Sequence, residues 1–157
     1  MNRYVGALLA AGIGAFEAIT AAVDVFDFSG NAAYVGTVLS MQNTSDPDSW
    51  RAIHSPALWH LAYGLIWLAH AACGAVTLAG AWLLVTAQRD AVARAGQIAI
   101  AGIGIGALLY LVGFQTIAGA WFLLWSAPTP PDPLMAARSY CTCYVGVMIF
   151  LLLATRE

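Results

Sequence analysis

The sequence predicts an all-α polytopic membrane protein, in which four transmembrane helices form a bundle and a short interfacial helix lies in the first outer loop. Three observations predict this fold. Hydrophobic residues make up 61% of the 157 residues. Charged residues make up only 9%, whereas soluble proteins contain roughly 25%. Several apolar stretches are long enough to cross a hydrocarbon core, which takes about 20 residues. The composition therefore excludes a soluble globular fold.

The predicted helices belong to a single membrane domain, residues 1–157, and each is bounded by a charged residue or a proline. The second and third are about thirty residues long, so we expect them to tilt or to extend beyond the lipid. The longest connection is an outer loop of residues 24–55. In chain order, the predicted transmembrane helices cover about residues 4–23, 56–85, 96–125 and 135–154.

The first predicted helix contains an acid and a stripe of small residues. Glu17 lies within the apolar run, where an acid costs at least about 2.5 kcal/mol, so it is a candidate functional residue. Glu17 also argues against a cleaved secretory signal, as does the lack of a small-residue cleavage site before Asp24. Gly6 and Gly14 belong to a stripe of small residues at four-residue steps. Such a stripe predicts close packing with another helix.

The outer loop is predicted to hold a short helix from about Ala32 to Met41, capped by Asn31 and lying along the membrane surface. Farther along, Arg51 follows an acidic, turn-rich stretch. We expect Arg51 to pair with Asp24 or Asp27 and to hold the loop over the bundle. The residues of this predicted loop lock are Asp24, Asp27, Asn31, Trp50 and Arg51.

The second helix is predicted to begin at Pro56, because proline suits the first helical position and Ser55 can cap it. In the third helix, Gly102 and Gly106 form a pair of small residues that favours a close helix contact. The fourth helix carries a C-x-C pair whose side chains point to different faces and cannot readily bridge to each other.

A polar layer is predicted in the outer half of the bundle. Counting inward from the outer helix ends places four polar side chains at similar depth: Glu17, His60, Tyr63 and Gln115. One interpretation is that they form hydrogen bonds that fix the helix register. The other is a proton, ion or small-ligand site.

The sequence does not favour a metal, haem or catalytic centre. His60 and His70 lie on one predicted helix, about 15 Å apart along its axis, so they cannot hold one haem iron between them. No other predicted helix supplies a histidine. No phosphate loop, nucleophile elbow or zinc-protease motif is present. We therefore expect no metal site and no cofactor other than bound lipid, we disfavour haem, and we expect a protein that is not an enzyme.

The arginines predict the orientation, since cytoplasmic loops carry an excess of basic residues. Arg3, Arg89, Arg94 and Arg156 would lie on one side of the membrane. The other side would carry fewer arginines and most of the acids. We therefore expect both termini in the cytoplasm, with the outer loop outside the cell.

Three segments carry a family resemblance. They are VLSMQNT from Val38, WRAIHSPALWH from Trp50 and GFQTIAGAWFLLWS from Gly113. In order and spacing, over nearly the whole chain, they resemble a bacterial family of predicted small integral membrane proteins, the domain of unknown function 2165. The resemblance implies a four-helix inner-membrane protein with no established activity. It also implies acidic residues where this chain has His70 and Ala120. The matched positions are Asn31, Trp50, Arg51, Ser55, Pro56 and His60.

These observations leave three functional hypotheses. The first is a non-catalytic accessory or scaffold subunit that packs against a larger inner-membrane complex, or against a second copy, through its stripes of small residues. The second is a small transporter or ligand-binding bundle with a polar site around Glu17 and His60. The third is a haem or redox subunit. The lipid bilayer is an expected partner in each case. Nucleic acid is not, because the net charge is −2 and no basic face is present.

Overall fold

The computed structural model describes residues 2–128 and 132–155. The described residues form helices and turns, with no strand among them, so the predicted all-α class is confirmed. Four helical segments are long and apolar enough to cross a membrane. These segments are Arg3–Phe26, Pro56–Thr86, Arg89–Trp121 and Pro133–Ala154. The first and last are longer than predicted by a few residues, and the third begins and ends earlier than predicted.

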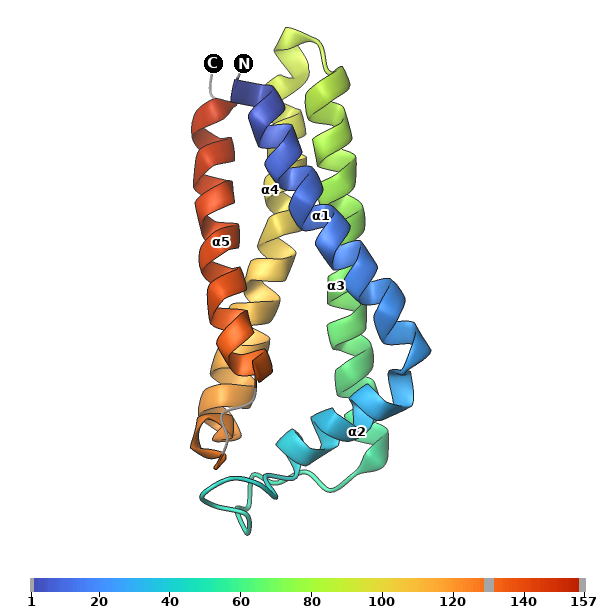
Figure 1. Cartoon of the computed structure of the whole chain (residues 1–157), viewed down its shortest axis with the longest axis vertical. Coiled ribbons are helices and arrows are strands. Elements are labelled where there is room, and N and C mark those ends of the chain that lie inside the picture. Colours follow the sequence, from blue (N-terminus) through green and yellow to red (C-terminus); the bar gives the residue numbers. More distant parts are fainter. Residues whose placement is uncertain (1, 129–131, 156–157) are drawn as a thin grey trace.

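The chain runs back and forth along one long axis (Figure 1). α1 begins and α5 ends at the same end of the bundle, where the short turn η1 (Arg89–Ala91) leads from α3 into α4. α2 lies across the opposite end. The α-helices are α1 (Asn2–Phe26), α2 (Phe28–Leu39), α3 (Pro56–Thr86), α4 (Val92–Leu108) and α5 (Asp132–Ala154).

Glu17 divides the bundle into two parts of different construction. We call the part toward the chain termini the terminal half and the part toward α2 the loop half. The terminal half comprises residues 2–17, 70–108 and 144–155. The loop half comprises residues 18–69, 109–128 and 132–143.

Glycines bring the helices of the terminal half into close contact. A Cβ atom placed on Gly80 of α3 would lie 2.5 Å from the Ala99 Cα of α4. The same construction on Gly14 meets the Leu78 side chain of α3 at 2.8 Å. Real Cβ atoms do not approach so closely, so these helices can pack at this distance only because glycine lacks a side chain. Backbone packing therefore holds the helices of the terminal half together.

All four glycines predicted for helix packing lie against neighbouring helices of the same chain. Gly6 meets Leu151 of α5, and Gly14 meets α3. Gly102 lies against Thr77 of α3. Gly106 lies under the Tyr144 ring of α5, at 2.6 Å from a constructed Cβ. These stripes of small residues are therefore occupied within the bundle.

The third span changes character where it enters the loop half. Beyond Leu108 it continues as η2 (Leu109–Trp121), a π-helix, in which each backbone N–H donates to the carbonyl five residues earlier. For example, the N–H of Phe122 donates to the Ile117 carbonyl at 3.0 Å. π-helices are rare and often occur at functional sites. α4 packs closely on α3, whereas its continuation η2 makes few contacts with α3. η2 and α3 separate toward the α2 end of the bundle (Figure 1).

The loop half is covered by α2, which begins earlier than predicted. The helix starts at Phe28, directly after a break at Asp27, and Asn31 lies within its first turn and does not cap it. The predicted cap is therefore corrected, because the chain turns into α2 straight from the end of α1. Gly36 rests on the Trp59 ring of α3. A separate apolar cluster joins α2 to the end of η2 and the start of α5: Val38, Met41, Phe122, Leu124 and Leu134.

Candidate functional site

Glu17 is completely buried and receives hydrogen bonds from each of the other three spans. Its Oε2 lies 2.5 Å from Nδ1 of His70 on α3. Its Oε1 accepts from the Tyr110 hydroxyl of η2 at 2.9 Å and from the Tyr144 hydroxyl of α5. A buried carboxylate is stable only when its oxygens are satisfied in this way. The four residues form one polar cluster, the Glu17 cluster, at the boundary between the halves.

Close helix packing positions the Glu17 cluster. Gly74 of α3 lies against the Ala18 backbone, with a constructed Cβ at 2.8 Å from Ala18 N, so α1 and α3 are in contact one residue after Glu17. Gly106 leaves the space that the Tyr144 ring occupies. Tyr110 belongs to the first turn of η2, and its ring contacts the rings of His70 and Tyr144 at centroid distances of 6.0 and 5.5 Å.

The charge of the Glu17 cluster depends on one proton. Two tyrosine hydroxyls donate to Glu17, and His70 Nδ1 forms a third hydrogen bond with it, in which Nδ1 donates when Glu17 is ionised. With a neutral imidazole the cluster carries one negative charge, and a proton on His70 Nε2 cancels that charge. No arginine of the described residues contacts the cluster. A net charge in a low-dielectric interior is costly, so the cluster favours a compensating cation.

A cavity of about 330 Å³ lies on the loop side of the Glu17 cluster, and we call it the polar cavity because several polar side chains lie in its largely apolar wall. His70 and Tyr110 belong to its wall, and His70 is only 5% exposed. The two nitrogens point away from each other across the ring, so Nε2 faces away from Glu17, and no described residue pairs with it. Thr20, Asp24, Asn31, Tyr63 and Tyr140 supply further polar groups around the cavity.

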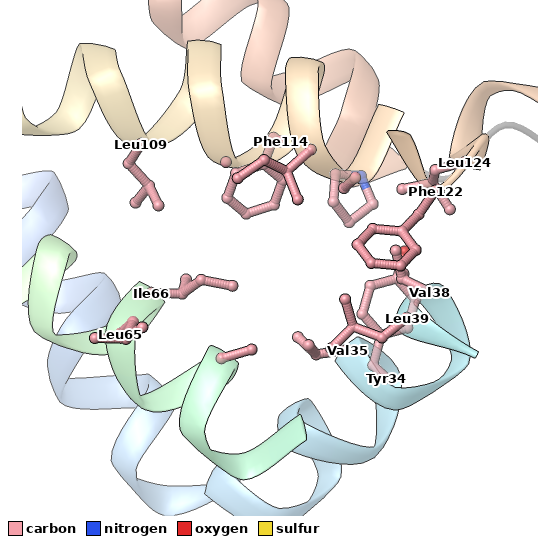
Figure 2. A pocket seen from close by; sticks show the side chains of 15 residues that line it. Tyr34, Val35, Val38, Leu39, Leu65, Ile66, Leu109, Phe114, Phe122 and Leu124 are labelled. Carbon is pink, nitrogen blue, oxygen red and sulfur yellow. The ribbon is translucent and has the colours of Figure 1, made fainter. Parts of the chain in front are cut away.

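An apolar cavity of about 280 Å³ adjoins the polar one (Figure 2). It lies between α2, α3 and η2, and its wall is almost entirely hydrocarbon: Figure 2 shows Leu65, Ile66, Leu109 and Phe114 across from Val35 and Leu39. Both cavities share five wall residues, so they are neighbours. The shared residues are Tyr34, Val35, Ile66, Phe114 and Pro133.

The predicted polar layer is only partly correct. Glu17 is its centre, but His60 is exposed and its Nδ1 bonds the Pro56 carbonyl within its own helix. Gln115 is half-buried and lines neither cavity. Tyr63 is buried and lines the polar cavity, where its hydroxyl donates to the Asp24 carbonyl at 3.5 Å. His60 and Gln115 are therefore corrected as partners of Glu17.

Sequence reasoning missed His70, Tyr110 and Tyr144 as the partners of Glu17. Residues at equal numbers of positions from the outer helix ends do not lie at equal depths in the bundle, because α1 crosses α3 at an angle (Figure 1). A usable signal was present in the small residues: Gly74 and Gly106 each lie four residues from His70 or Tyr110. A helix contact at these glycines brings the neighbouring polar side chains together.

The loop lock also differs from its prediction. Arg51 pairs with Asp46 at 3.4 Å and donates to the Trp121 carbonyl at 2.8 Å, and pairs with neither Asp24 nor Asp27. The Trp50 and Trp121 rings meet edge to face, with centroids 6.1 Å apart. Arg51 finds its acid five residues away in its own loop. The lock therefore ties the loop to the end of η2.

Of the remaining predicted loop residues, Asp24 lies in the wall of the polar cavity, as does Asn31. The Asp27 carboxylate lies against Gly30 at the start of α2. The described residues contain no group of three or more metal-ligating side chains.

Comparisons with known proteins give one match. A family model described as "Predicted small integral membrane protein (DUF2165)" matches residues 2–154. No curated protein and no solved structure matches the chain.

Proposed function

Because the chain belongs to the DUF2165 family of predicted small integral membrane proteins, we propose a function that is exercised within the bilayer: the protein binds a small amphipathic molecule between its helices. One observation carries this proposal. A polar cavity ending at His70 adjoins an apolar cavity bounded by α2, α3 and η2. The polar part of a ligand would occupy the first cavity and its hydrocarbon part the second.

The construction of the bundle supports binding from one side. Glycine contacts such as those of Gly80 and Gly102 bring the helices of the terminal half together, and no residue of the Glu17 cluster lines the two hollows found there. The loop half is splayed and covered by α2, and Asp24 and Asn31 lie at the α2 side of the polar cavity. A ligand would therefore enter beneath α2 and stop at the Glu17 cluster.

The orientation that we propose places this opening outside the cell, with both termini in the cytoplasm of a bacterial inner membrane. The positive-inside rule supports it. Arg3 lies at the terminal end, where its guanidinium donates to the Ala87 carbonyl at 3.0 Å, and Arg89 follows two residues later. The cytoplasmic surface would carry this basic group, and the outer loop would carry most of the acids.

The hypothesis of an accessory or scaffold subunit has less support. It depended on stripes of small residues available to a partner, whereas Gly6, Gly14, Gly102 and Gly106 contact other helices of the same chain. That hypothesis stays a prediction, and these four glycines do not support it.

Photoaffinity labelling of the purified full-length protein tests the proposed binding. The probe is an uncharged monoacylglycerol with a diazirine in its acyl chain, and labelled residues are mapped by mass spectrometry. We expect labels on residues of the apolar cavity wall, such as Ala62 and Phe114. Ala118→Trp fills this cavity and should reduce these labels at least about tenfold, whereas Ala120→Trp, on an exposed position of the same helix, should leave them unchanged.

Labels confined to lipid-facing residues such as Leu8 and Leu153, with none in the cavity wall, would refute the proposal. Equal labelling of the Ala118→Trp and Ala120→Trp proteins would also refute it, because a ligand inside the cavity must be displaced by the indole ring.

A further inference from the structure

The walls of the two cavities carry acidic and aromatic side chains but no arginine or lysine. Asp24 lies in the polar wall, and Glu17 lies directly behind His70. An anionic ligand would meet these acids without a counter-charge. A cation would be attracted by them and by the faces of the aromatic rings. The aromatic residues of the polar cavity wall, besides His70, are Phe16, Tyr34, Tyr63, Tyr110, Phe114 and Tyr140.

The Glu17 cluster supplies a second reason for a cation. The Glu17 carboxylate has an exposed fraction of 0% and forms three hydrogen bonds. Among its three partners, only His70 can become positively charged and so neutralise the carboxylate. His70 Nε2 lies on the side of the ring away from Glu17, and the ring forms part of the cavity wall. A proton reaching Nε2 and a cation in the cavity would therefore compensate the same buried negative charge.

The titratable groups that face this site come from all the elements packed around it. α1 contributes Glu17 and Asp24, and α3 contributes His70, Tyr63 and Cys73. The remaining groups are Tyr34 of α2, Tyr110 of η2, and Tyr140 and Tyr144 of α5. Tyrosine and cysteine are neutral near pH 7. The imidazole of His70 is then the one group of this set that ordinarily changes charge near neutral pH.

We propose that the polar cavity binds a lipophilic organic cation in exchange for one proton held by the Glu17 cluster. This inference rests on the proposed function and names the chemical class of its ligand. The cation enters beneath α2, the proton leaves Nε2 of His70 for water, and Nδ1 keeps its hydrogen bond to Glu17. No covalent bond to the ligand forms or breaks. The total charge of the site is the same before and after the exchange.

The two cavities would bind different parts of such a cation. The aromatic wall and Asp24 surround the charged centre, while the apolar cavity between α2, α3 and η2 accepts its hydrocarbon groups. A small hydrated cation would gain little from this wall, because Asp24 is its one carboxylate and most of the remaining surface is hydrocarbon or aromatic. A cation whose charge is shielded by hydrocarbon groups loses little hydration on entering, so the site favours that class.

Binding of tritiated tetraphenylphosphonium to the full-length protein, followed by scintillation proximity, tests the exchange. Binding should be several-fold tighter at about pH 8 than at about pH 6, because a proton and the cation compete for one site and an ordinary imidazole changes its protonation within this range. In weakly buffered solution, a pH-sensitive dye should report close to one proton released per cation bound. Tetraphenylborate has nearly the same shape and the opposite charge, and it should not compete.

Three variants connect the result to named groups. Glu17→Gln should abolish the proton release and weaken cation binding at least about tenfold, since the buried charge is gone. Asp24→Asn, in the cavity wall, leaves the Glu17 cluster intact and should weaken binding a few fold, while Asp27→Asn, outside both cavities, should not change it. If the Glu17→Gln protein does not fold, the comparison of Asp24→Asn with Asp27→Asn still tests recognition of the cation by charge.

Cation binding that is independent of pH and releases no proton would overturn the exchange. Equal binding of tetraphenylborate, or equal effects of Asp24→Asn and Asp27→Asn, would overturn recognition by charge. If the uncharged photoprobe labels the cavity but tetraphenylphosphonium does not bind, the inference fails and the proposed function stands. If the photoprobe labels no cavity residue, the proposed function itself fails.

Discussion

The terminal half and the loop half of the bundle differ in glycine content and in how closely their long spans pack. In the terminal half, Gly80 and Gly102 of neighbouring helices lie against backbone or short side chains, and no Cβ could be added without displacing them. In the loop half, Gly64 has its nearest neighbour at 3.9 Å, and Gly113 meets only a side chain of its own helix. Small residues therefore bring the helices of one half into backbone contact, while the other half holds the two adjoining cavities beside the Glu17 cluster and α2.

Glycine content accounts for part of this difference, since ten of the fifteen glycines lie in the terminal half, and the course of the third span contributes as well. In the loop half, the third span is the π-helix η2, which diverges from α3, and α2 occupies the end of the opening. Aromatic side chains such as Phe114 and Tyr140 line the remaining space without filling it. The Glu17 cluster lies where the two types of packing meet.

The largest effect is expected from breaking the close packing of the terminal half. Gly80→Ala places a methyl group against the Ala99 backbone, so α3 and α4 must separate. We expect the free energy of unfolding to fall by about 3 kcal/mol, the upper end of the usual cost of overpacking. Titration of the purified protein with sodium dodecyl sulfate, followed by circular dichroism, measures this change.

Gly104→Ala is the matched control, because no atom lies within 4 Å of a Cβ placed there. It should leave the stability unchanged or raise it slightly, as alanine favours helix more than glycine does. If Gly80→Ala and Gly104→Ala lowered the free energy of unfolding equally, close contact at Gly80 would not be what stabilises the terminal half.

A smaller effect is expected at the boundary between the halves. Tyr144→Phe removes one of the three hydrogen bonds to Glu17 and leaves the packed ring in place. We expect a loss of about 1.5 kcal/mol in the same measurement, since a buried acceptor loses a donor. Tyr140→Phe serves as the comparison, because the Tyr140 hydroxyl makes no hydrogen bond with a described residue. If the two variants were equally stable, Glu17 would not depend on its tyrosine donors.

The smallest effect is expected at the outer loop. Arg51→Ala removes a partly exposed ion pair with Asp46 and the hydrogen bond to the Trp121 carbonyl. Surface pairs contribute little, so we expect a loss of less than about 1 kcal/mol. Hydrogen exchange should nevertheless become faster in the loop around Arg51 while α3 and α4 stay protected. Arg89→Ala, an exposed arginine at the opposite end, should change neither quantity; faster exchange throughout the bundle would show that the lock supports more than the loop.

The sequence by itself determined the membrane class, the approximate helix bounds and the location of Glu17 within the first span. These properties depend on local composition, because about 20 consecutive apolar residues suffice to identify a span and one acid within them stands out. The start of α3 at Pro56 was equally local and is observed as predicted, although the Ser55 side chain makes no capping hydrogen bond. The family resemblance was carried by contiguous motifs and is confirmed by the match over residues 2–154.

The tertiary structure alone decided which side chains meet. Whether Glu17 contacts His60 or His70 depends on the crossing angle of α1 and α3, which is set by contacts such as Gly74 against Ala18. The choice of Asp46 as the partner of Arg51 depends on how the loop turns back on η2. The cavities depend on the divergence of η2 from α3. Such properties arise between helices distant in sequence, whereas composition and periodicity describe each helix separately.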